Sequence, residues 1–122
     1  MKKHTILIID DNPRNLETIV EHLREHDFGI VNARSGEEGL QVARYARPDL
    51  ILLDVLMPGI DGFETCRRLK ADEATRDLPV IFMTVLGSTE DRVKGFEVGG
   101  VDYIPKPFQH EEVLARVTTH LR

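Results

Sequence analysis

The hydrophobic residues of this chain fall into short unbroken runs separated by longer amphipathic segments. Runs rich in β-branched residues occupy positions 5–9, 28–33, 50–53, 80–84 and 101–104. Two of them, Ile-Leu-Ile-Ile at 6–9 and Leu-Ile-Leu-Leu at 50–53, show no alternation with polar residues. Such runs are typical of strands covered on both faces, because a strand with one wet face alternates. The pattern therefore predicts a parallel sheet packed between helices.

The segments between these runs carry helical spacing and helix start signals. The residues expected at or just before the helix starts are Pro13, Ser35, Asp61, Ser88 or Thr89, and Gln109. Ser35 with Glu38 three residues later has the pattern of a capping box, and Gly99 followed by Gly100 ends the fourth helix. Strands that alternate with helices five times predict right-handed crossovers and a doubly wound α/β fold. No linker or repeat divides the chain, so we expect one domain over residues 1–122.

The composition narrows the class of protein. The chain has 122 residues, of which 41% are hydrophobic and 30% charged, as in ordinary globular domains. Its net charge of -5 disfavours direct binding to nucleic acid and to an anionic membrane surface, since both need a basic face. No apolar run approaches the roughly 20 residues of a membrane span, and the N-terminus lacks the pattern of a signal peptide. We therefore expect a cytoplasmic domain.

The cysteine and histidine content argues against a structural metal centre. Cys66 is the single cysteine, which excludes an internal disulfide and a cysteine-based zinc cluster. Among the five histidines only His22 and His26 have i,i+4 spacing on a predicted helix. We interpret this pair as solvated helix surface rather than as a metal site, because no further ligand pattern accompanies it.

Polar side chains follow four of the five predicted strands. Asp10 and Asp11 come directly after the first strand, and Asp54 follows the third. The fourth strand ends at Thr84, and Lys106 follows the fifth. In open α/β sheets ligands bind outside the carboxyl ends of the strands. We therefore expect these five side chains to share one site.

The residue types at these strand ends favour phosphoryl chemistry. Three neighbouring carboxylates repel one another, and a hard cation such as Mg²⁺ relieves that repulsion. The cation, the Lys106 ammonium and the Thr84 hydroxyl together suit the transfer of a phosphoryl group to a carboxylate. Each residue alone has an ordinary explanation, as a turn, a cap, a strand threonine or a surface lysine. Their joint placement favours a site.

Four segments give the chain a resemblance to the receiver domains of two-component response regulators, including the chemotaxis regulators. They are Ile-Leu-Ile-Ile-Asp-Asp-Asn at 6–12, Asp-Val-Leu-Met-Pro-Gly-Ile-Asp-Gly at 54–62, Phe-Met-Thr at 82–84, and Asp-Tyr-Ile-Pro-Lys-Pro-Phe at 102–108. The segments occur in the family's order and spacing. The resemblance implies a flavodoxin-like (βα)5 fold with strand order 2-1-3-4-5 and an ordered core over residues 4–122.

The resemblance also implies a role for each residue of the acidic site. Asp54 would be the phosphoacceptor, which takes a phosphoryl group from a phosphohistidine of a histidine kinase or a phosphotransfer protein. Mg²⁺ or Mn²⁺ would bind Asp11, Asp54 and the backbone carbonyl of Leu56 directly, and Asp10 mostly through water. Lys106 would contact the phosphoryl group.

The same resemblance implies a switch that begins at Thr84. Thr84 and Tyr103 would form the switch pair, in which the hydroxyl moves toward the phosphoryl group and the ring turns inward. The peptide bond between Lys106 and Pro107 would be cis. The switch face would comprise the fourth helix, the fifth strand and the fifth helix. Its charged residues, expected either as a solvated face or as ion pairs between subunits of a phosphorylated dimer, are Lys94, Asp102, Glu112 and Arg116.

Three positions depart from the family's usual pattern. Val85 stands where a small residue is common, and we expect its branched side chain to crowd access to Asp54. Leu56 and Leu86 are apolar where family members often carry polar groups that position the hydrolytic water. We therefore predict slow self-dephosphorylation.

The predicted function is a phosphorylated switch rather than an enzyme. The domain is expected either as a stand-alone regulator or, as we favour, as the receiver part of a longer protein with an output domain or of a hybrid kinase. A phosphohydrolase of the haloacid-dehalogenase type needs an Asp-x-Asp pair and a cap, whereas Asp10 and Asp11 are adjacent and no cap segment is present. A receiver-like binding module without phosphorylation predicts the loss of Asp54, an acidic partner or Lys106, and all are present.

Overall fold

The computed structural model describes residues 3–85 and 89–121. Leu86 and Ser88, which the sequence marks as a position near the site and as a helix start, lie outside the described residues. Strands and helices alternate over the described ranges as β1 (Thr5–Ile9), α1 (Pro13–Glu25), β2 (Gly29–Ala33), α2 (Gly36–Ala46), β3 (Leu50–Asp54), α3 (Gly62–Ala71), β4 (Val80–Thr84), α4 (Thr89–Glu97), β5 (Asp102–Pro105) and α5 (His110–His120). All paired strands are parallel, in the order β2-β1-β3-β4-β5. The predicted fold class is confirmed.

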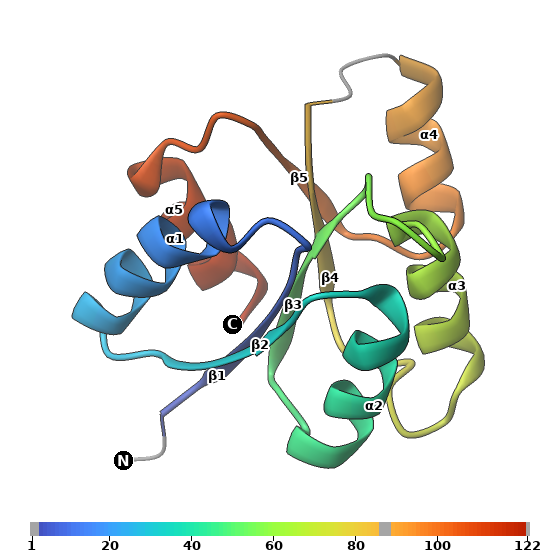
Figure 1. Cartoon of the computed structure of the whole chain (residues 1–122), viewed down its shortest axis with the longest axis horizontal. Helices are drawn as coiled ribbons and strands as arrows, with labels where there is room; N and C mark the ends of the chain where they lie inside the picture. Colours follow the sequence, from blue (N-terminus) through green and yellow to red (C-terminus); the bar gives the residue numbers. More distant parts are fainter. Residues whose placement is uncertain (1–2, 86–88, 122) are drawn as a thin grey trace.

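Helices cover both faces of the sheet, with α1 and α5 on one side and α2, α3 and α4 on the other (Figure 1). Successive side chains of β1 point alternately to the two faces of the sheet. Ile6 and Ile8 pack in the core with α1 and α5, whereas Leu7 and Ile9 pack in the core with α2 and α3. Every residue of β3 and β4 is buried. The unbroken apolar runs of the sequence thus have their predicted cause, which is burial on both faces.

Side-chain caps fix the starts of three helices. Asn12, Ser35 and Asp61 each accept a hydrogen bond from a backbone N–H in the first turn, at 3.0, 3.1 and 2.8 Å. The predicted capping box at Ser35 and Glu38 differs in one bond, since Glu38 does not accept from the backbone N–H of Ser35 itself. The Glu38 carboxylate accepts from the N–H of Arg34 at 2.7 Å, one residue before the cap. These bonds satisfy N–H groups that have no partner within the helix.

The strand limits differ from the sequence prediction by one residue in three places. β2 begins at Gly29, β3 includes Asp54, and β5 is shifted to Asp102–Pro105. Phe28 lies outside β2 because its N–H donates to the carbonyl oxygen of Leu23 and closes the turn after α1. Local turn bonds of this kind are not visible in hydrophobic spacing.

α3 begins in close contact with the end of β3, and Gly62 makes this close approach possible. A Cβ atom at Gly62 would lie 2.7 Å from the Cα of Val55 and closer still to the carbonyl oxygen of Asp54. Both are backbone atoms, which cannot swing aside as a flexible side chain can. The absence of a side chain at Gly62 therefore lets the helix begin beside Asp54.

The two histidines near the end of α1 are not equally solvated. His26 is exposed, but His22 is partly buried, with its ring centroid 4.6 Å from that of His110 at the start of α5. The expectation of solvated surface is correct for His26 and wrong for His22, because helical spacing does not show which helix packs over a residue. Within the described ranges, the one group of three clustered metal-ligating side chains contains no histidine. None of the helices in those ranges is both long enough and apolar enough to cross a membrane.

Candidate functional site

The carboxyl ends of the strands bring the predicted site residues to one edge of the sheet. Asp10 follows β1 and is fully buried, while Asp54 ends β3 and is 4% exposed. Thr84 ends β4 and is buried as well. The backbone N–H of Lys106, just after β5, donates to the carbonyl oxygen of Thr84 at 3.0 Å. The parallel register therefore assembles residues that are as many as 96 positions apart in the chain.

Three carboxylates form the centre of this edge. Asp10, Asp11 and Asp54 each place a carboxylate oxygen within 4.8 Å of the other two. One Asp10 oxygen accepts from the N–H of Asn12 at 2.9 Å, which orients the carboxylate from within its own loop. These are hard oxygen donors gathered on a largely buried surface, which is the donor set that Mg²⁺ prefers. The residues present therefore fit a divalent cation.

One ammonium group lies among the carboxylates. The Lys106 Nζ is 3.1 Å from Asp54 Oδ1 and 3.4 Å from Asp10 Oδ2, and its side chain is largely buried. One positive charge opposes three negative ones when all the carboxylates are ionised, so the site keeps a negative excess. The peptide bond that follows, between Lys106 and Pro107, is cis.

This arrangement perturbs the acidity of Asp54. Burial, and next the negative charge of Asp10, raise the pKa of Asp54 to about 6. The hydrogen bond and the charge of Lys106 oppose the increase but do not cancel it. The ionised form of Asp54 is thus disfavoured inside the folded protein, so a further nearby cation would stabilise its charge.

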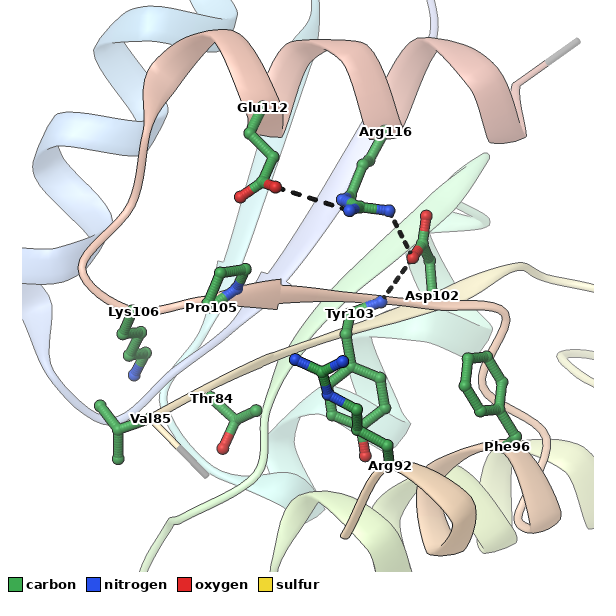
Figure 2. Close-up of a pocket in the computed structure, with 10 residues that line it drawn as sticks. All are labelled: Thr84, Val85, Arg92, Phe96, Asp102, Tyr103, Pro105, Lys106, Glu112 and Arg116. Atoms are coloured by element: carbon green, nitrogen blue, oxygen red, sulfur yellow. Dashed lines mark hydrogen bonds and ion pairs between the residues drawn. The ribbon is translucent and has the colours of Figure 1, made fainter. Parts of the chain in front are cut away.

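Tyr103 packs inside the protein rather than on its surface. The side chain is 9% exposed, and its hydroxyl donates to the backbone carbonyl oxygen of Asp91 in α4. Its ring centroid lies 5.6 Å from Phe82 and 5.8 Å from Phe96. Figure 2 shows the side chain pointing from β5 toward α4. The Tyr103 ring therefore lies inward, against α4.

A cavity of about 280 Å³ lies between α4, β5 and α5, beside Thr84 and Lys106 (Figure 2). Charged side chains of β5 and α5 form a network of hydrogen bonds and ion pairs at this cavity. Arg116 pairs with Asp102 at 2.7 Å and with Glu112 at 3.5 Å, and His120 Nε2 lies 3.0 Å from the second oxygen of Asp102. The cavity thus joins the acidic site to the charged face expected from the sequence.

The charged network holds Asp102 in its ionised form. Burial alone raises the pKa of Asp102, but hydrogen bonds from the Tyr103 N–H, Arg116 and His120 outweigh it and bring the pKa below its usual value. The sequence prediction missed His120 in this network, although its position four residues after Arg116 is a usable signal. Lys94 takes no part in these bonds and instead lies 4.9 Å above the ring of Phe63.

The departures from the family pattern that fall in the described ranges lie at the surface. Val85 is 65% exposed and Leu56 is 54% exposed. Both follow the strand ends that carry the site, β4 and β3. Leu56 leaves an apolar surface where family members often carry a polar side chain, and Val85 leaves a branched one where a small residue is common.

The sequence of the chain matches a known protein family and several of its members. A family model described as the response regulator receiver domain matches residues 6–118. The chain is 44% identical over 117 residues to the DNA-binding dual master transcriptional regulator RpaA of Synechocystis sp., covering 96% of this chain and 48% of that protein. It is 42% identical over 118 residues to the phosphate regulon transcriptional regulatory protein PhoB of Pseudomonas aeruginosa, covering 97% of this chain and 52% of that protein.

A solved structure agrees with the sequence relatives. The BeF3-activated N-terminal receiver domain of RstA from Klebsiella pneumoniae has a TM-score of 0.90 and 33% identity, with 98% of this chain and 99% of that chain covered. The chain spans about half the length of the two regulators above. The strand order, the acidic edge and these matches show together that the chain belongs to the response regulator receiver domain family of two-component signal transduction, a family of signalling proteins rather than classical enzymes.

Proposed function

We propose that residues 1–122 form a single receiver domain that is phosphorylated on Asp54 by a histidine kinase or a phosphotransfer protein. The observation that carries the proposal is the gathering of Asp54 with two further carboxylates and the Lys106 ammonium at one edge of the sheet. A haloacid-dehalogenase-like hydrolase would need a cap over its substrate. A binding module without phosphorylation would not need Lys106 beside Asp54.

Each residue has a defined part in the transfer. An oxygen of Asp54 forms a bond to phosphorus, while the phosphorus–nitrogen bond of the phosphohistidine breaks and its electron pair stays with the imidazole nitrogen. Lys106 and the Thr84 hydroxyl would stabilise the phosphoryl oxygens. Asp10, Asp11, Asp54 and the backbone carbonyl of Leu56 would hold Mg²⁺ or Mn²⁺. The bound cation would supply further positive charge for the phosphoryl oxygens.

Intact mass spectrometry tests this function directly. We expect the protein to gain the mass of one phosphoryl group when it is incubated with Mg²⁺ and a small acyl-phosphate donor, and to gain none with a chelator present. Fragmentation after reductive trapping should place the modification on Asp54. If neither the donor nor beryllofluoride produces an adduct, the domain is a binding module and the proposal fails.

We propose further that the aspartyl phosphate is long-lived. Leu56, two residues after Asp54, is an exposed apolar side chain that gives the attacking water no hydrogen-bond acceptor, and Leu86 is apolar as well. The exposed, branched side chain of Val85 is expected to crowd access to Asp54. Replacement Leu56→Asn is expected to speed the decay of the phosphorylated mass peak several-fold, with Leu56→Met as the size-matched control. Equal decay of the two variants would show that this position does not limit hydrolysis.

The face formed by α4, β5 and α5 is proposed as the output surface, either toward a domain in the full-length protein or toward a second copy of the chain. Phe96 of α4 is exposed and lines the same cavity as the Asp102–Arg116 pair, and Val93 is exposed on the same helix, so this face carries both apolar and charged groups. The net charge of -5 supports a domain that itself contacts neither nucleic acid nor membrane, and we place it in the cytoplasm.

Sedimentation velocity tests the dimer. We expect beryllofluoride to shift the protein from monomer to dimer, and Arg116→Ala to weaken that dimer about two- to fivefold, which is the range for a partly exposed ion pair. Arg76→Ala, which removes a surface pair with Glu73 remote from this face, serves as the control. A protein that stays monomeric with beryllofluoride would leave an output domain as the partner of this face.

A further inference from the structure

α4 contains a glycine in its interior where a glycine weakens a helix. The helix spans Thr89–Glu97, and Gly95 is its buried residue. Glycine is a poor choice inside a helix, because it loses more conformational freedom on folding than any other residue. Neither a turn nor a helix end requires it at this position, so the reason has to come from what packs against it.

The neighbour of Gly95 is the side chain of Tyr103. A Cβ atom built on Gly95 would lie 2.9 Å from both Cε2 and Cζ of the Tyr103 ring, and closer still to the hydroxyl oxygen. Cβ atoms in proteins essentially never approach another heavy atom within 3.0 Å. All three of the nearest atoms belong to this one ring. Any side chain at position 95 therefore competes with Tyr103 for the same space.

The Tyr103 ring can avoid a side chain at position 95 by rotating about its Cα–Cβ bond. The three crowded atoms are at the far end of a side chain that rotates about its Cα–Cβ bond, and they are not backbone. The rest of its surroundings favour the inward position, through the hydrogen bond to the Asp91 carbonyl oxygen and the contacts with Phe82 and Phe96. Tyr103 also lines the cavity on the α4–β5–α5 face, which opens to solvent. A methyl group at position 95 is therefore expected to turn the ring out of its slot.

We propose that Gly95 is a positioning residue for the switch. Because Gly95 has no side chain, the Tyr103 ring can pack against α4, and position 95 thereby sets how readily the ring takes its inward position on the α4–β5–α5 face. The proposal rests on the proposed function, in which Tyr103 is a member of the switch pair. Gly95 itself touches neither Asp54 nor the carboxylates around it. Its effect is on the equilibrium between two ring positions.

This role has a consequence for phosphorylation that follows from linkage. A phosphoryl group that favours the inward ring is in turn favoured by it, since coupling between two sites is reciprocal. A substitution that penalises the inward ring lowers the affinity for a phosphoryl mimic while the residues that bind the mimic remain in place. Gly95→Ala should therefore weaken beryllofluoride binding without abolishing it.

Tyrosine fluorescence reports the ring position in the unphosphorylated protein. The chain has two tyrosines and no tryptophan, and the other tyrosine, Tyr45, is 93% exposed. In a Tyr45→Phe background the emission comes from Tyr103 alone. We expect Gly95→Ala to raise the acrylamide quenching constant at least threefold, and Glu97→Ala in the same helix to leave it unchanged. An unchanged quenching constant in Gly95→Ala overturns the proposal.

A double-mutant cycle separates a positioning role from a general effect on the helix. In the Tyr103→Ala background the methyl group at position 95 meets no ring, and Gly95→Ala should raise the midpoint of urea unfolding as alanine does in an ordinary helix. In the Tyr103 background the same change should lower that midpoint or leave it unmoved. If Gly95→Ala fails to fold, recovery in the double variant supports the proposal, and unfolding of the double variant overturns it.

The same variants keep the two proposals distinguishable. The quenching and urea measurements need no phosphorylation, so they stand even if Asp54 accepts nothing. If the protein does bind beryllofluoride, Gly95→Ala should bind it at least threefold more weakly, with the mass spectrum still showing phosphorylation at Asp54. Equal beryllofluoride affinity together with a displaced ring would overturn the link to the switch.

Discussion

Asp54→Asn is expected to prevent phosphorylation of the chain and at the same time to stabilise the metal-free protein at pH 7. The first effect follows because the amide has no anionic oxygen to form the bond to phosphorus. The second follows because Asp54 is a carboxylate whose folded pKa is raised to about 6, chiefly by burial and by Asp10. Two changes of opposite sign from one substitution exclude misfolding as the cause of lost phosphorylation.

The pH dependence of the stability difference has a definite sign. The folded protein binds the Asp54 proton more tightly than the unfolded chain does, so the stability of the wild-type protein falls as pH rises from about 4 to about 6. A pKa raised by about two units corresponds to about 3 kcal/mol. The free energy of unfolding of Asp54→Asn should therefore exceed that of the wild type by about 2–3 kcal/mol above pH 6 and equal it near pH 4.

Urea unfolding in the presence of a chelator measures this difference across the pH range. Asp77→Asn, which removes an exposed carboxylate, is the matched control and should change stability by no more than about 0.5 kcal/mol. Added Mg²⁺ should stabilise the wild-type protein more than the Asp54→Asn variant, because binding to the folded state alone adds to its stability. A variant less stable than the wild type at pH 8 would contradict the burial argument.

Lys106→Met is expected to have the opposite effect on stability. The Lys106 ammonium lies within 3.4 Å of both Asp10 and Asp54, and its loss leaves buried carboxylates without a counter-charge. Removing one partner of a buried ion pair costs about 3–5 kcal/mol. Asp54 can relieve part of this by taking up a proton, so we expect a loss of about 2–4 kcal/mol at pH 8 and a smaller loss at pH 5.

The control for Lys106→Met is a lysine in an exposed pair. Lys3 lies 3.5 Å from Asp27, with both side chains largely in solvent, so Lys3→Met should cost less than about 1 kcal/mol. Mg²⁺ should restore most of the stability that Lys106→Met loses, since a divalent cation neutralises the same carboxylates. If Lys106→Met were as stable as the wild type in chelator at pH 8, the ammonium would not be balancing the site.

The sequence alone determined the fold class and the position of the acidic site. Unbroken apolar runs at 6–9 and 50–53 indicate strands buried on both faces, and their alternation with helical segments indicates that helices form the two covering layers. The strand ends are set by the same runs, so Asp10, Asp54 and Lys106 had to meet at one edge of a parallel sheet. These are consequences of residue order, which a single chain displays in full.

Only the tertiary structure decided which side chains from different elements compete or pair. The contact of His22 with His110, the bond of His120 to Asp102, and the ring of Tyr103 against Gly95 all join elements that local spacing treats separately. In sequence, Gly95 is only a weak point in a helix; in the structure it is the space that a ring occupies. Packing depends on the distances between elements, and periodicity within one element carries no such distances.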